Sequence, residues 1–239
     1  MSKPVGIHNR GNQCYQICVE QSFRSIEKHF NIKIPRKLRS SSLTQYRDAR
    51  VQHDAHEFLI HVLDALENWE LYKTFFEGSF TEEIKYSCGH QKDKQVPCTV
   101  LSVPLYSTLE KMISFLESRD DVESECDVCK VKRPAEKMMY VTSLPKICIF
   151  HLVRFDMNGG KRNDKVDIPF SWNYMRKEGR YTCKAFIVHH GNVLGGHYVS
   201  YVCYDNLWYK CNDRSVTQIT DVSQQLSHAY IIFYVLDNR

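Results

Sequence analysis

The sequence has no apolar run long enough to span a lipid bilayer, so it predicts no transmembrane helix. Its amino terminus has no apolar signal core, and we therefore expect an intracellular protein, cytoplasmic or nuclear. No dense basic run with interleaved aromatic residues occurs, and the formal net charge of +4 is too small to indicate a nucleic-acid partner. Internal repeats and low-complexity segments are also absent from the sequence.

Cysteine is too sparse for a disulfide scaffold. Ten cysteines in 239 residues are consistent with reduced thiols, metal ligands and a nucleophile. The hydrophobic share of 43% and the charged share of 25% are those of a soluble globular protein. The length allows one large domain or two small ones, with a sizeable core.

A cysteine lies where a helix is predicted to begin. Residues 6–15 (GIHNRGNQCY) place Cys14 before apolar residues that share one helical face, namely Val19, Phe23, Ile26 and Phe30. The free amides and the dipole of a helix N-terminus favour a thiolate, which is a nucleophile. The glycines and asparagines upstream suit a tight turn that can aim amide donors at an oxyanion. The alternative is a buried cysteine that packs as a small hydrophobe.

A second helix is predicted after residues 52–54. Its apolar stripe consists of Ala55, Phe58, Leu59, Val62, Leu63 and Leu66. Asp54 can cap this helix, with Glu57 three residues later in capping-box fashion. Between the two helices, residues 31–43 contain Pro35 and a basic, serine-rich stretch, and we expect a mobile connector there.

The middle of the chain predicts strands over residues 80–86 and 96–105 and a short helix over 108–118. It also contains a CxH pair and a CxxC pair. The set Cys88, His90, Cys126 and Cys129 would complete a tetrahedral, structural zinc site. The alternatives are a knuckle without metal, or a different ligand such as Cys98.

The last part of the chain is rich in strand patterns. Runs at residues 144–152, 181–189, 198–204 and 229–236 predict an antiparallel sheet that packs against the two helices. His197 follows a glycine pair at the start of one strand, and Asn212 and Asp213 end the next polar-apolar segment. If these strands pair, a side-chain amide or carboxylate meets the imidazole, and with Cys14 they form the parts of a cysteine-hydrolase triad.

In these motifs the chain resembles the ubiquitin-specific proteases, which are papain-like cysteine deubiquitinases. Residues 6–15 resemble the cysteine box GLxNxGNTCY, 52–59 resemble QQDAxEFL, and 189–201 resemble the histidine box HxGxxxxGHYxxY. Four further motifs follow in the family's order. The second zinc knuckle begins at residue 126, the LPxxLxxHLxRF strand at 144, the WxxFNDxxV segment at 208 and the closing AYxLFY strand at 229.

The resemblance implies a role for each matching position. Cys14 is the implied nucleophile, His197 the general base and acid, and Asn212 the residue that orients the histidine. Asp213 is implied to share that orienting role, and Asn9 to donate to the oxyanion. The implied ubiquitin-tail residues are Asp54, Glu57, His189, Gly196 and Tyr198.

The sequence therefore predicts a single α+β catalytic domain over residues 1–239, with a papain-like fold. Its implied parts are a helical thumb (about 1–70), β fingers with the zinc knuckle (about 71–142) and a palm sheet (about 143–239). The predicted activity is hydrolysis of the bond after the C-terminal glycine of ubiquitin, through a thioester and without a catalytic cofactor. Ubiquitin and ubiquitinated proteins are the expected partners of a monomer that binds neither nucleic acid nor membrane.

Three alternatives remain at this stage. The first is a protease for another modifier that ends in Gly-Gly. The second is a catalytically silent protein that only binds ubiquitin. The third is a zinc-knuckle interaction module, which leaves the histidine box and Asn212 without a purpose.

Overall fold

Two helices cover one face of a large sheet in the computed structural model, which describes residues 3–35, 46, 48–155, 160–174, 179–192 and 195–237. Helix α1 (Cys14–Phe30) buries Val19, Phe23 and Ile26 of its predicted apolar face, and Phe30 is partly buried. The helix ends at Asn31, whose left-handed backbone (φ 51°) stops it. Most of the predicted connector, residues 36–43, lies outside the described part. Among the described helices, none is both long and apolar enough to cross a membrane.

Helix α3 (Ala55–Leu66) buries the whole predicted stripe and packs against α1. Its first turn is capped by the Asp54 carboxylate, which accepts hydrogen bonds from the backbone N–H groups of His56 and Glu57. The predicted capping box forms only in part. Among the described residues, the Glu57 side chain accepts no hydrogen bond from the backbone N–H of Asp54. The short α4 (Tyr72–Phe76) follows and contacts the sheet.

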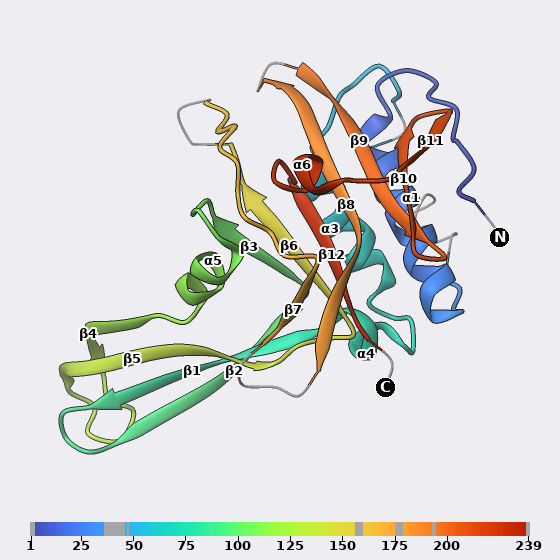
Figure 1. Cartoon of the computed structure of the whole chain (residues 1–239). Coiled ribbons are helices and arrows are strands. Elements are labelled where there is room, and N and C mark those ends of the chain that lie inside the picture. Colours follow the sequence, from blue (N-terminus) through green and yellow to red (C-terminus); the bar gives the residue numbers. More distant parts are fainter. Residues whose placement is uncertain are drawn as a thin grey trace.

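Within the described residues, the large sheet has eight strands, seven of them in the order β11-β10-β9-β8-β12-β6-β3, with β7 paired to β8 (Figure 1). The pairs are antiparallel except β3 with β6. The strands are β3 (Val100–Pro104), β6 (Ile147–Val153), β7 (Ser171–Asn173), β8 (Arg180–Asn192), β9 (Gly195–Tyr204), β10 (Leu207–Asn212), β11 (Ser215–Ile219) and β12 (Ile231–Leu236). The predicted antiparallel sheet behind the two helices is confirmed.

Each face of this sheet has its own apolar core, because side chains alternate along a strand. Ile149, Ile187 and Phe233 face α1 and α3. Their neighbours Phe150 and Phe186 face the opposite side, which is covered by α5 (Leu109–Leu116) and α6 (Ser223–Leu226). A sheet buried on both faces explains why its central strands read as nearly continuous apolar runs.

A four-stranded sheet projects away from this body in the order β2-β1-β5-β4 (Figure 1). Its strands are β1 (Gly78–Tyr86), β2 (Gln91–Cys98), β4 (Arg119–Glu125) and β5 (Lys132–Ser143). The far end has a small core of its own, in which Tyr86, Cys126 and Ala135 are buried. Because so few apolar side chains are buried here, the apolar core alone contributes little stability to this end of the sheet.

The predicted strand over residues 96–105 is wrong in one respect, since it belongs to two strands in different sheets. Cys98 is the last residue of β2 paired with β1, whereas Val100 already pairs with Ile149 of β6. Strand β4 was not predicted, because its sequence RDDVESE is mostly exposed and carries no alternating apolar signal.

We expect Phe23→Ala to lower the free energy of unfolding by about 3–5 kcal/mol, because truncating a fully buried aromatic ring leaves a cavity. The matched control is Phe115→Ala, whose ring is 56% exposed and whose loss should cost less than about 0.5 kcal/mol. Urea denaturation at an unchanged m value measures both. Equal losses would contradict the assigned position of α1.

Candidate active site and metal cluster

The turn before α1 is built around Asn9. Its Oδ1 accepts hydrogen bonds from the backbone N–H groups of Gly11 (3.0 Å) and Gln13 (3.1 Å). A Cβ on Gly11 would lie 2.3 Å from the carbonyl oxygen of Ala49, so only glycine fits between these segments. The turn delivers Cys14 as the first residue of α1.

The Cys14 thiol is nearly buried, with 4% exposure, and its pKa is raised above the ordinary value. Burial is the main cause, and the negative charge of Asp213 adds to it. Backbone N–H groups, that of Tyr198 foremost, act in the opposite direction. The amides at the start of the helix thus lower the pKa of the thiol as expected, but burial outweighs them and the net shift is upward.

His197 and Asn212 are joined by a hydrogen bond of 2.6 Å between Nε2 and Oδ1. The two residues lie on the paired strands β9 and β10. An amide oxygen only accepts, so Nε2 carries the proton and Nδ1 remains free to act as a base. The prediction that these strands bring the two side chains together is confirmed as geometry.

Cys14 lies beside this pair, since its thiol is within reach of the backbone N–H of Tyr198, the residue after His197. Helix α1 packs directly against β9. No hydrogen bond from the Cys14 thiol to the imidazole is formed in the described part of the chain.

Asp213 contacts Asn9 rather than the histidine. It lies in the β10–β11 turn with a left-handed backbone (φ 50°), and its Oδ2 accepts a hydrogen bond from Asn9 Nδ2 (3.1 Å). The backbone carbonyl of Asp213 accepts from the N–H of Ile7 (2.9 Å). Asp213 thus holds the Asn9 amide in place, and one of the two Nδ2 hydrogens remains available.

Asp54 ties the helices to the sheet. Besides capping α3 through Oδ1, it accepts hydrogen bonds at Oδ2 from the hydroxyls of Tyr198 (2.8 Å) and Tyr230 (2.7 Å). Both of its oxygens are therefore engaged inside the protein. Glu57, one turn away, is exposed and has no side-chain partner among the described residues.

The hairpin between β8 and β9 passes very close to its own side chains. A Cβ on Gly196 would lie 2.2 Å from His189 Nε2 and 2.3 Å from the carbonyl oxygen of His190, which requires glycine. The His189 ring lies against Tyr198, with the ring centroids 4.6 Å apart and the planes tilted by 47°, and His189 is 9% exposed. Burial, helped by the positive charge of Lys161, lowers the pKa of His189 to about 4, so its ring is neutral near pH 7.

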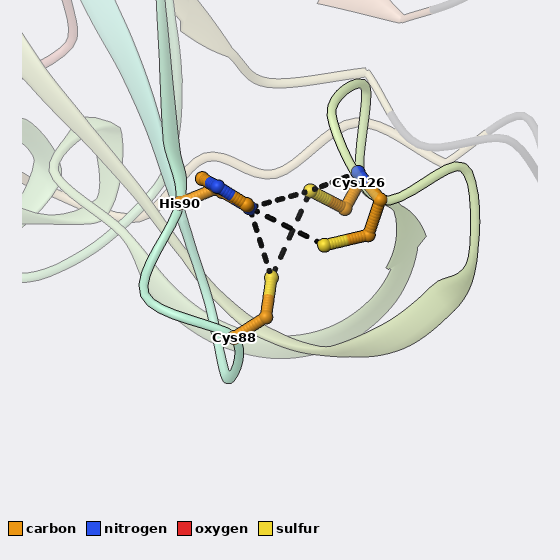
Figure 2. A group of neighbouring side chains, drawn as sticks. Cys88, His90 and Cys126 are labelled. Carbon is orange, nitrogen blue, oxygen red and sulfur yellow. Dashed lines mark hydrogen bonds between the residues drawn. The ribbon is translucent and has the colours of Figure 1, made fainter.

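The four predicted metal ligands converge at the far end of the four-stranded sheet (Figure 2). His90 Nδ1 lies 3.4 Å from Cys88 Sγ, 3.5 Å from Cys126 Sγ and 3.3 Å from Cys129 Sγ. The sulfurs of Cys88 and Cys126 are 3.7 Å apart. The backbone N–H groups of Cys129 and Val128 are among the groups that lower the pKa of Cys126 to about 6, as suits a metal ligand.

These separations fit one tetrahedral ion. Bonds of about 2.3 Å to sulfur and about 2.0–2.1 Å to nitrogen place neighbouring ligand atoms about 3.5–3.8 Å apart. The cluster could therefore hold a metal ion, and the short CxH spacing allows both side chains to reach it. Cys98 is not part of the cluster.

Two residues of the site were missed by the motif analysis. Tyr230 donates to Asp54, but in the sequence it reads only as the start of an apolar strand. Lys161 donates through Nζ to the carbonyls of His189 (2.7 Å) and Gly191 (3.0 Å), and it lies in a segment of mixed charge. Hydrogen bonds to distant residues carry no signal in a local pattern, so neither could have been found that way.

Helices, a two-faced sheet and a projecting smaller sheet form the α+β, papain-like fold of the ubiquitin-specific protease type. The chain belongs to the ubiquitin carboxyl-terminal hydrolase family, whose model matches residues 28–234. The matched segment begins after Cys14.

Several relatives carry the same family name. Ubiquitin carboxyl-terminal hydrolase 23 of Arabidopsis thaliana is 27% identical over 228 residues, which cover 81% of this chain and 26% of that protein. Ubiquitin carboxyl-terminal hydrolase 20 of the same plant is 31% identical over 213 residues, covering 77% and 30%. The chain thus spans less than a third of the length of either relative.

Solved structures share the fold at low identity. The SAGA DUB module of Ubp8, Sgf11, Sus1 and Sgf73 bound to monoubiquitin matches with a TM-score of 0.80 and 21% identity, over 98% of this chain and 69% of that one. The same module bound to ubiquitin aldehyde matches with a TM-score of 0.77 and 20% identity, over 98% and 70%.

We expect Asp54→Ala to lower the free energy of unfolding by about 3 kcal/mol, because it removes a helix cap and leaves two tyrosine hydroxyls without an acceptor. Tyr230→Phe should cost about 1 kcal/mol alone and much less in the Asp54→Ala background. Glu57→Ala is the exposed control and should cost under about 1 kcal/mol. Strictly additive losses in the double variant would contradict the shared hydrogen bond.

Alkylation of Cys14 by iodoacetamide should be slow at pH 7 and should still be accelerating above pH 9, because the raised pKa keeps the sulfur protonated. Peptide mass spectrometry reports the rate for this cysteine alone. In the urea-unfolded chain, which serves as the control, the rate profile should move to lower pH. A native profile that reaches its plateau below pH 8 would disprove the assigned environment.

Proposed function

We propose that this chain is a thiol-dependent deubiquitinase that hydrolyses the bond after the C-terminal glycine of ubiquitin. The observation that carries the proposal is the His197–Asn212 hydrogen bond beside Cys14 in a member of this hydrolase family. Two structural relatives are described as bound to monoubiquitin and to ubiquitin aldehyde, which supports the same ligand here.

In the proposed reaction, His197 Nδ1 takes the proton of the Cys14 thiol. The sulfur attacks the carbonyl carbon of the terminal glycine, and the carbonyl oxygen becomes an oxyanion. His197 returns the proton to the leaving lysine amine, the C–N bond breaks, and a thioester remains. Water, deprotonated by His197, then releases ubiquitin with a free carboxylate and restores the thiol.

The oxyanion is stabilised by the free N–H of Asn9 Nδ2 and by backbone N–H groups near Cys14. Asp213 supports this role by fixing the Asn9 amide, so no reorientation is needed during the reaction. The loss of one such donor costs about 3 kcal/mol of transition-state stabilisation.

The ubiquitin tail, which has arginines ahead of its Gly-Gly end, is proposed to run past Glu57, His189, Gly196 and Tyr198. Glu57 is exposed and supplies a carboxylate for an arginine, and the glycine end of the tail is proposed to pass the β8–β9 hairpin beside Gly196. Asp54 contributes chiefly by holding the Tyr198 hydroxyl.

Residues of about 1–70, 71–142 and 143–239 are proposed to act as thumb, fingers and palm around a bound ubiquitin. In this arrangement the four-stranded sheet supports the body of ubiquitin while its tail lies between helices and large sheet. We also propose that the protein acts inside the cell as a monomer.

One observation favours a second candidate, a catalytically silent ubiquitin-binding protein. The Cys14 thiol has a raised pKa and makes no hydrogen bond to the imidazole among the described residues. For the enzyme, ubiquitin binding must bring the two groups into contact, because a buried neutral thiol is a poor nucleophile.

Cys14→Ala should abolish release of a fluorophore attached by an amide to the C-terminal glycine of ubiquitin, because no other side chain can form the thioester. Binding of ubiquitin, measured by calorimetry, should remain within about twofold, since only one sulfur atom is removed. Cys203→Ala is the matched control, because Cys203 lies on β9, the strand that carries His197. This variant should retain full turnover.

A wild-type protein that binds ubiquitin but neither turns it over nor reacts with a ubiquitin electrophile at Cys14 would be the silent protein. Electrophiles built on other Gly-Gly-ending modifiers separate the remaining alternative. Turnover by Cys14→Ala close to that of the wild type would refute the proposed nucleophile.

We further propose that Cys88, His90, Cys126 and Cys129 hold a structural zinc ion. The ligand separations and the three sulfur donors fit zinc. When bound, zinc would cross-link β1, β2, β4 and β5 at the end of the sheet where the apolar core is smallest.

The purified protein should contain one zinc ion per chain by elemental analysis. Cys129→Ser should lose the metal, because removing one of four ligands from a structural site is strongly destabilising. It should also make the four-stranded sheet sensitive to protease. Cys98→Ser lies outside the cluster and should retain the metal, and equal zinc contents in the two variants would contradict the ligand set.

A further inference from the structure

A cavity of about 450 Å³ is lined by side chains from residues 161–165, strand β8 and α6. Helix α6 packs against β8 (Figure 1). We call this cavity the basic cavity, because its described lining includes Arg154, Lys161, Lys165, His189, His190 and His228 but no aspartate or glutamate.

The positive charges in the basic cavity are not neutralised by contact with acids. The buried Arg154 side chain donates hydrogen bonds to backbone carbonyls, including those of Ala229 (2.7 Å) and Asp164 (2.9 Å). Lys161 likewise binds only carbonyls, and among the described residues no ion pair engages Lys165. Among the described residues, the carboxylate whose charge acts on Arg154 is that of Asp164, which forms an ion pair with Arg162 (2.9 Å).

The pKa values of the histidines are lowered by the same positive charges. Burial lowers the pKa of His228, and Arg154, Lys165 and Lys161 lower it further. The pKa of His190 is lowered in the same way, and every titratable neighbour that shifts it is a lysine or a histidine. Arg154, Lys161 and Lys165 all act on His228 and so lie close to one another, and a bound anion would relieve the repulsion among their three positive charges.

A buried polar atom without a partner belongs to the cavity lining. Gln225 lines the cavity, and its Oε1 is buried without a hydrogen-bond partner among the described residues. Since half a turn of the Gln225 amide exchanges its oxygen for an N–H donor, the side chain can serve an anion. Unsatisfied buried groups of this kind are uncommon in native proteins and call for a ligand or an ordered water.

We propose that the basic cavity is a binding site for a small anion bearing phosphate groups, such as a pyrophosphate-containing compound. The converging side chains form a concave site rather than a stripe along the surface, and its volume is that of small-molecule sites. Lysine, arginine and amide N–H donors are the groups that bind phosphate oxygens. This proposal does not depend on the proposed hydrolytic function.

The basic cavity lies against the strand pair that carries His197. Lys161 binds the carbonyls of His189 and Gly191 in β8, and His190 is paired with His197 across the ladder. An anion bound to Lys161, Lys165 and His228 would therefore link residues 161–165 and the segment of α6 to the β8–β9 hairpin. We expect it to stabilise the folded protein by mass action.

The test is calorimetric titration of inorganic pyrophosphate into the full wild-type chain at low ionic strength. We expect a single site and a higher melting temperature in its presence. Lys165→Gln should weaken binding about tenfold through the loss of one charge-assisted contact, whereas Lys165→Arg should retain it. Lys165 is exposed, so these variants should fold.

The matched control is Lys94→Gln, the same charge change on exposed strand β2. It should leave pyrophosphate binding unchanged. Equal weakening by Lys94→Gln and Lys165→Gln would show nonspecific attraction and overturn the site. No binding of pyrophosphate, or binding only of a phosphopeptide, would also overturn the proposal.

Discussion

The carboxylate of Asp54 joins the helical half of the protein to the sheet. One oxygen caps α3, and the other receives the hydroxyls of Tyr198 and Tyr230 from two strands of the sheet. Because Tyr198 follows His197, the same carboxylate that starts a helix also fixes the strand that presents the imidazole. Asp54 is half-buried and both of its carboxylate oxygens accept hydrogen bonds, so removing the carboxylate leaves its partner groups unsatisfied. This junction joins α3 to the histidine strand, whereas the cysteine helix α1 packs directly against β9.

Close backbone packing is the second constraint on the site. Gly11 meets residue 49 and Gly196 meets His189 at distances that no side chain could tolerate. The cysteine turn and the histidine hairpin are therefore held by backbone contacts as well as by side-chain hydrogen bonds. Sites on such well-supported turns keep their donors oriented before a substrate arrives, which is what oxyanion stabilisation requires.

Local patterns predicted the individual elements well. The stripe of α3 was predicted residue by residue, and the start of α1 at Cys14 was predicted too, because amphipathic periodicity and a capping aspartate are local properties of the chain. Strand β4 escaped because charged residues on an exposed strand carry no burial signal. The junction between β2 and β3 escaped because only pairing with distant strands separates them. The site residues themselves came from ordered motifs, and their chemistry required only the correct residue types.

The sequence by itself determined the helices, the central strands, the cysteine and histidine clusters and the family they resemble. Only the tertiary structure decided that Asp213 holds Asn9 instead of the histidine, that Asp54 is fully engaged, and that six basic side chains surround one cavity. It also decided that burial raises the pKa of the Cys14 thiol more than the nearby backbone N–H groups lower it. The physical reason is the same in each case. Desolvation, charge repulsion and hydrogen bonding depend on groups far apart in the chain, and their distances exist only once the sheet has formed.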